Sequence, residues 1–279
     1  MSAFKYYIGI DYSGAKAPVS RLAQLQVYES KVNSVPKRVE PYDKGAKNWC
    51  RKEVAKYVSE LLIAKSNVII GIDHGFSFPK SYFEKYRIKT WDGFLTYFTN
   101  EWQTERDHMY VDFARKRNSV GGKNTDYRLC ECWASGAKSV FHFDVQGSVA
   151  KSTHAGLPWI KALRSDPEIR SKTHFWPFDG FDVPEDKSVV VEVFPTLFRR
   201  RFKREGRTAD QQDAYVVSAW LRDMDRRGAI MDYFNPPLNI NILNEFISSN
   251  DKPCIENIST NGDLVSLKYS QFIPLLFFP

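Results

Sequence analysis

Two short apolar runs that each end in an aspartate constrain the fold of this chain more than any other feature of its sequence. KYYIGID ends at Asp11, and NVIIGID ends at Asp73. Each run has the length and composition of a buried strand. In an open α/β sheet, ligands bind at the carboxyl ends of the parallel strands. Two neighbouring parallel strands would therefore place Asp11 and Asp73 side by side at that edge.

The segment between these runs contains two weaker strand patterns and one helix pattern. LAQLQVYES alternates in part as a strand does, and a third strand is expected around residues 35–39. From Val54 to Leu62, apolar residues recur at steps of three and four, which places them on one helix face. The order is thus three hairpin-connected strands, a helix, and a buried strand parallel to the first.

The region from about residue 80 to 187 is rich in aromatic residues and poor in clean periodicity, so we expect an insertion on the core. Within it, WDGFLTYFTNEW favours a helix and NSVGGKNTDYR a loop. SVVVEVF, residues 188–194, predicts the next buried strand. Glu192 interrupts this strand, and a charged residue there needs a partner.

The last firm element is a helix that begins after residue 208. Thr208 and Gln211 match the capping-box pattern, an apolar face follows, and Arg227 and Gly228 mark the end. NPPLNINIL then predicts a break that leads to a shorter helix.

Length and composition favour one elaborated domain over residues 1–279, because 43 % of the residues are hydrophobic. The sequence has no run of about eighteen apolar residues and no leader-like start, so neither membrane insertion nor export is expected. Four scattered cysteines indicate a cytoplasmic protein without a disulfide-linked partner. Cys130 and Cys132 form a C-x-C pair, but no second Cys/His pair has a matching spacing for zinc.

Two further acids, Asp210 and Asp213, lie three residues apart and hence on one helix face. Together with Asp11 and Asp73 they would form a cluster of like charges, in which each carboxylate raises the pKa of its neighbours. Mg²⁺ or Mn²⁺ relieves that repulsion, since hard oxygen ligands suit these ions. A pair of such ions can activate water and stabilise the leaving oxygen in phosphodiester cleavage.

Three of the four acids also have structural interpretations. Asp11 with Gly14 fits a type I turn, and Asp73 fits a cap for a helix near Ser77. Asp210 in a first helical turn favours the helix dipole without any metal. Asp213 lies beyond that turn and gains little from the dipole.

Several motifs resemble those of domain of unknown function family 429, whose members are predicted to be RNase H-like nucleases distantly similar to resolvases of the RuvC type. The motifs are IGIDYSG, IIGIDHGFSFP, VVVEVFP and DQQDAYVVSAWL. The resemblance covers about residues 4–79 and 188–227 and also touches KSVFHFDVQGSVAKSTHAGLPWI in the middle region. It implies an α/β fold with a mixed five-stranded sheet flanked by helices.

The resemblance also implies site residues and an activity. Metal binding and catalysis would fall on Asp11, Asp73, Asp210 and Asp213, and Glu192 would be an auxiliary acid. Resolvases commonly carry glutamate at the fourth-strand position, where this chain has Asp73, one methylene shorter. The implied activity is that of a metal-dependent phosphodiester hydrolase acting on DNA or RNA with Mg²⁺ or Mn²⁺.

A basic run precedes the last helix and is the candidate nucleic-acid contact. The chain has a formal net charge of +7, and neutralised phosphates release counterions when such a protein binds nucleic acid. The alternative interpretation is that this basic run is a solvent-exposed surface with no binding role. Its basic residues are Arg199, Arg200, Arg201, Lys203, Arg204 and Arg207.

Two other functions remain open from the sequence. IGIDYSGAK could hold ATP phosphates as in actin-like phosphotransferases, with Lys16 near the phosphates, although no second phosphate loop follows. The chain could also be a non-catalytic RNase H-like binding module.

Histidines and aromatic residues supply weaker candidates. His74 adjoins Asp73 and could carry protons, and the glycine-bearing segment between His142 and His154 could wrap a phosphate. Exposed aromatics can stack bases, but at this density they usually fill a core. The aromatic candidates are Trp159, Trp176 and Phe178.

Overall fold

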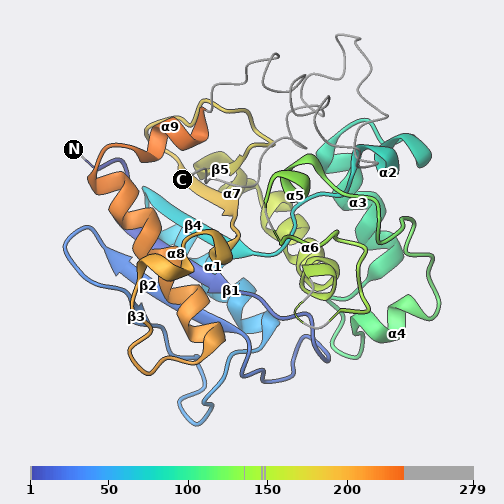
Figure 1. Cartoon of the computed structure of the whole chain (residues 1–279), viewed down its shortest axis with the longest axis horizontal. Coiled ribbons are helices and arrows are strands. Elements are labelled where there is room, and N and C mark those ends of the chain that lie inside the picture. Colours follow the sequence, from blue (N-terminus) through green and yellow to red (C-terminus); the bar gives the residue numbers. More distant parts are fainter. Residues whose placement is uncertain (1, 135, 146, 148, 236–279) are drawn as a thin grey trace.

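A six-stranded mixed sheet forms the centre of the computed structural model, which describes residues 2–134, 136–145, 147 and 149–235 (Figure 1). The strand order is β3-β2-β1-β4-β6-β5. β2 runs antiparallel to both of its neighbours, β1 and β3, whereas β1, β4, β6 and β5 all run parallel to one another. The strands are β1 Tyr6–Asp11, β2 Gln26–Lys31, β3 Lys37–Arg38, β4 Val68–Asp73, β5 Thr173–Trp176 and β6 Ser188–Glu192.

Helices cover both faces of the sheet, as Figure 1 shows for α8 on one side. The long ones are α1 Arg51–Ala64, α3 Trp91–Trp102, α6 Val149–Ser165 and α8 Ala209–Arg226. The short ones are α2 Lys80–Lys85, α4 Val111–Arg115, α5 Leu129–Trp133, α7 Pro167–Lys172 and α9 Ile230–Phe234, and two 3-10 turns, η1 Pro195–Leu197 and η2 Arg199–Arg201, precede α8.

Alternation along the strands divides the apolar side chains between two cores. Ile8 and Ile70 belong to the cluster that also contains the apolar residues of α1, α3 and α6. Tyr7 and Ile69, one residue earlier in each strand, belong to the cluster under α8 and α9. This follows from the period of two, which sends successive side chains to opposite faces.

Gly9 lets α8 lie directly on β1. A Cβ atom at this position would lie 2.7 Å from the Ser218 backbone nitrogen, and it would overlap the Ala214 carbonyl oxygen. Gly71 is its neighbour on β4, and a Cβ atom there would meet the Val217 side chain at 2.6 Å. The two glycines therefore set the position of α8 over the ends of both strands.

We expect Gly9→Ala to lower the free energy of unfolding by about 2 kcal/mol, because the added methyl group pushes α8 away from the sheet. Urea denaturation measures this change. The matched control is Gly45→Ala, whose Cβ atom would meet only Asp43 Oδ1 at 3.4 Å. Equal stability of the two variants would contradict the close approach of α8.

Much of the expected element order is confirmed, and the strand number is wrong. The helices expected at residues 54–62, 91–102 and after Thr208 are α1, α3 and α8, and the capping box of α8 is formed by Thr208 and Gln211. The sheet has six strands rather than five, because Thr173–Trp176 adds an edge strand to β6. A four-residue run is too short to stand out in an aromatic-rich region.

The region between β4 and β6 is mainly helical, and its last part is the strand β5. The shorter helix expected in NPPLNINIL and the tail after it lie outside the described residues, as does Cys254. Cys50 and Cys130 are buried free thiols. None of the described helices combines the length and apolar character needed to cross a bilayer.

Candidate functional site

Asp11 and Asp73 are paired in register at the ends of the adjacent parallel strands β1 and β4. Each lies two residues after the glycine that contacts α8, so each side chain is directed to the α8 face of the sheet. The placement of the two acids side by side, expected from the sequence, is what the strand register shows.

The first turns of α8 bring Asp210 and Asp213 to the same place. The capping box at Thr208 fixes the start of this helix, and the close contact at Gly9 fixes its distance from the sheet. Asp213 is only 7 % exposed. All four acids line one cleft with a volume of 830 Å³.

The carboxylates destabilise one another in their charged forms. Burial raises the pKa of Asp11 well above its usual range, and the nearby charges of Asp73, Asp213 and Asp210 raise it further. The pKa of Asp73 is also raised well above its usual range, first by burial and then by Asp213 and Glu192. The acids therefore hold protons that an unhindered aspartate would release, or they require a cation.

Arg199 supplies positive charge to this group. Its Nε and Nη2 atoms donate hydrogen bonds to the two carboxylate oxygens of Asp213. The guanidinium charge lowers the pKa values of Asp11 and Asp73 in opposition to burial, yet both stay raised. The pKa of Asp213 is also raised by burial despite this ion pair.

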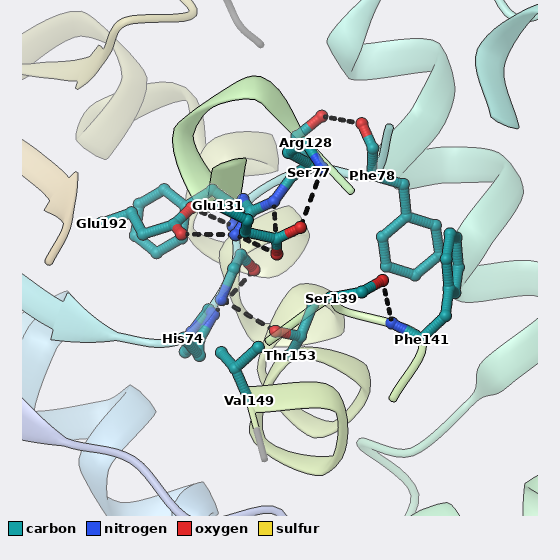
Figure 2. Close-up of polar contacts among 12 residues, drawn as sticks. His74, Ser77, Phe78, Arg128, Glu131, Ser139, Phe141, Val149, Thr153 and Glu192 are labelled. Carbon is teal, nitrogen blue, oxygen red and sulfur yellow. Dashed lines mark hydrogen bonds and ion pairs between the residues drawn. The ribbon is translucent and has the colours of Figure 1, made fainter. Parts of the chain in front are cut away.

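Glu192 belongs to a different set of contacts, shown in Figure 2. It follows the alternation of Val190, so it lies on the opposite face of the sheet from Asp73. Its two carboxylate oxygens accept hydrogen bonds from Arg128 at 2.9 and 2.8 Å, and one also accepts from the Phe76 backbone nitrogen at 2.7 Å. Glu192 is thus held as a buried ion pair next to the cluster.

Arg128 was not singled out from the sequence, although it is the partner that Glu192 required. It is 3 % exposed and also binds Glu131 in α5, with 3.0 Å between Arg128 Nε and Glu131 Oε1. Figure 2 shows its guanidinium between the two glutamates. Because Arg128 and Glu192 are 64 residues apart, no local sequence spacing connects them.

Basic side chains also line the cleft. Lys16, Lys138 and Lys151 line the same cleft as the four acids. The loop that carries Lys16 is held by Arg51, whose guanidinium donates to the carbonyl oxygens of Ser13, Ala15 and Lys16. The cleft therefore combines acidic and basic side chains, which suits a phosphate ester and a metal ion together, although Lys151 is already paired with Asp112.

The basic run before α8 divides into anchored and exposed residues. Arg207 donates to Gln212 Oε1 at 2.8 Å and its guanidinium lies 3.6 Å from the centre of the Tyr215 ring. Arg204 donates to the carbonyl oxygen of Arg207. Arg200, Arg201 and Lys203 are exposed.

The structure places most of the weaker candidates in the core. His74 is buried, its Nδ1 lies 3.0 Å from the Gly75 carbonyl oxygen, and burial lowers its pKa to about 4. His154 is buried among aromatic rings within α6, and its pKa is about 3 for the same reason. Trp176 is fully buried, and Phe178 stacks on Trp91 at 3.9 Å.

Two candidates are less enclosed. Trp159 is partly buried against the larger core cluster. His142 lies in the segment before α6 and is also partly exposed. The segment between His142 and His154 contributes Val149, Lys151 and Ser152 to the cleft.

The chemistry of the site fits a hard divalent cation. Four carboxylates supply oxygen ligands, and Arg199 already supplies a positive charge to one of them. Within the described part of the chain, no three His, Cys, Asp or Glu side chains form a ready set of metal ligands. Asp213 is bound to Arg199, so the acids would have to rearrange to hold a metal.

Comparisons with known proteins add no relative: no protein-family model, curated protein or solved structure matches this chain.

Proposed function

We propose that this protein is a metal-dependent phosphodiester hydrolase, a nuclease that acts on DNA or RNA. The observation that carries the proposal is the convergence of four carboxylates from β1, β4 and α8 in one cleft, where burial and mutual repulsion raise the pKa values of Asp11 and Asp73. Such a group gains most from a divalent cation.

The topology supports an RNase H-like assignment. An antiparallel β3-β2-β1 unit is followed by β4 and β6 parallel to β1, with β5 as an additional edge strand. The cleft shared by the strand-end acids and the α8 acids supports the site that the resemblance to domain of unknown function family 429 implies.

Asp11, Asp73, Asp210 and Asp213 would hold Mg²⁺ or Mn²⁺. When bound, such an ion activates water and stabilises the leaving oxygen of a phosphate ester. The four aspartates would hold the ion in place. Glu192, beside them, stays neutralised by Arg128. Lys16 and Lys138 in the cleft lining are suited to the charge of a phosphate backbone.

Arg200, Arg201 and Lys203 extend the positive surface outside the cleft, next to Arg199. They are the members of the basic run most available for a nucleic-acid backbone, because Arg204 and Arg207 are already bonded within the protein. We therefore assign them to backbone contact without base recognition.

The actin-like alternative has less support. A Cβ atom at Gly14 would overlap the Lys151 carbonyl oxygen and would lie 2.7 Å from the Ser152 nitrogen. The side of Gly14 that a Cβ atom would occupy is therefore filled by the backbone of α6, so this glycine is explained by helix packing and need not serve a phosphate. A non-catalytic module would not need the four acids in one cleft.

Incubation with labelled DNA and RNA tests the hydrolase. We expect cleavage of at least one of them in the presence of Mg²⁺ or Mn²⁺ and its loss when EDTA removes the ion, because the acids cannot activate water alone. Product length on a denaturing gel is the readout. Intact DNA and RNA at every metal concentration would overturn the proposal.

A further inference from the structure

Arg199 combines an anchored backbone with a half-exposed side chain. The residue before it, Phe198, is buried and stacks on Trp220 of α8 with 5.4 Å between ring centres. The Arg199 side chain is nevertheless 46 % exposed. Its guanidinium therefore reaches Asp213 from the solvent side of the cleft and can leave without disturbing the core.

The ion pair uses both oxygens of an acid that the cluster needs. Nε and Nη2 of Arg199 each bind one carboxylate oxygen of Asp213. Among the described residues, no other cation forms an ion pair with Asp11, Asp73, Asp210 or Asp213. Arg199 thus occupies the place of a cation in an otherwise acidic group.

The contrast with Arg128 shows why Arg199 is exchangeable. Arg128 makes the same kind of bidentate contact, but its side chain is 3 % exposed and lies between two glutamates. Removal of Arg128 would leave two buried charges uncompensated, whereas the half-exposed guanidinium of Arg199 can return to water when another cation takes its place at Asp213. A divalent cation is attracted to the four aspartates more strongly than the single charge of a half-exposed guanidinium is.

We propose that Arg199 is an internal counter-cation that holds Asp213 in the metal-free protein and is displaced when a divalent cation binds. The inference rests on the proposed function, because it concerns the same acidic site. The two cations exclude each other at Asp213, since its two oxygens cannot serve both in the same way. Metal binding and the Arg199–Asp213 ion pair are then competing equilibria.

Calorimetric titration with Mn²⁺, without any nucleic acid, tests the exchange. We expect Arg199→Gln to bind Mn²⁺ about tenfold more tightly than wild type, within the usual range of coupling between two ligands. The matched control is Arg115→Gln, which removes the same charge from a bidentate pair with Asp144 away from the acids. The affinity of this control should equal that of wild type.

Two further variants keep the test decisive. Arg199→Lys retains the charge without the bidentate contact, so its affinity should lie between those of wild type and Arg199→Gln. Addition of Asp213→Asn to Arg199→Gln should remove the gain. Thermal unfolding gives a second readout, in which Mn²⁺ should raise the melting temperature of Arg199→Gln more than that of Arg115→Gln.

Equal Mn²⁺ affinities of Arg199→Gln and Arg115→Gln would overturn the exchange, whether or not wild type cleaves nucleic acid. Absence of Mn²⁺ binding to both variants would overturn it as well. Tighter binding by Arg199→Gln together with no cleavage by wild type would support the exchange and reject the hydrolase.

Discussion

Asp11→Asn is expected to abolish metal-dependent cleavage while making the metal-free protein more stable at neutral pH. The asparagine keeps the shape of the side chain but removes one charge from the repelling group. We expect the cleavage rate to fall on the order of a thousandfold, which corresponds to about 4 kcal/mol of lost transition-state stabilisation. We expect stability to rise by about 1 kcal/mol, the usual scale for one stabilising substitution.

The raised pKa of Asp11 determines how the stability of the folded protein changes with pH. Burial and neighbouring acids raise the pKa of Asp11 in the folded protein, so the folded state binds the proton more tightly than the unfolded state. Stability is therefore highest below the unfolded-state pKa of about 4 and falls as the pH rises towards the folded-state pKa. Asp11→Asn should flatten that fall, and saturating Mn²⁺ should do the same for wild type.

Urea denaturation between pH 4 and pH 8 measures the effect, with Asp107→Asn as the control. Asp107 is an exposed acid paired with Lys52 in the described structure. Its substitution should leave both the pH profile and the cleavage rate unchanged. A metal-free Asp11→Asn variant that is less stable than wild type at pH 8 would contradict the picture of mutually repelling acids.

Arg128→Met is expected to destabilise the protein by about 3–5 kcal/mol, because it leaves two buried glutamates without their cation. Glu131 and Glu192 both depend on this guanidinium. The pKa values of both glutamates are raised by burial, and Arg128 opposes that rise. Without Arg128, both pKa values should rise further, so the loss of stability should be larger at pH 8 than at pH 5.

A cycle of variants separates charge from packing. Glu131→Gln and Glu192→Gln together should recover most of the stability of Arg128→Met, since they remove the unpaired charges. Lys52→Met breaks an exposed ion pair with Asp107 and should cost less than 1 kcal/mol. If Arg128→Met lowers the free energy of unfolding in chemical denaturation by no more than Lys52→Met does, Arg128 does not have this stabilising role.

The sequence was most informative where local pattern determines structure. The apolar runs that form β1 and β4 and the capping box of α8 are local signals, and the structure confirms both. The carboxyl-edge rule for parallel strands then placed Asp11 beside Asp73. The strand and helix signals use residues that are near one another in the chain, and the carboxyl-edge rule joins the two strand ends without any knowledge of individual contacts.

Contacts between distant segments were not accessible in the same way. The charge of Glu192 signalled that a partner was required, but nothing in the sequence selected Arg128 from forty basic residues. Arg199 was assigned to nucleic-acid contact, and the structure pairs it with Asp213. The strand β5 is not predicted from the sequence, because it has only four residues and pairs in parallel with β6, from which residues 177–187 separate it in the chain.

The position of Arg128 also bears on the modularity of this chain. The residue comes from the region between β4 and β6, and it neutralises a glutamate of the central sheet. Most of the buried aromatic residues of that region share one apolar cluster with β1 and β4. A shortened protein that lacks residues 80–172 would expose this cluster to water and leave Glu192 buried without its cation. The sheet and the helical region should therefore unfold together in a single thermal transition.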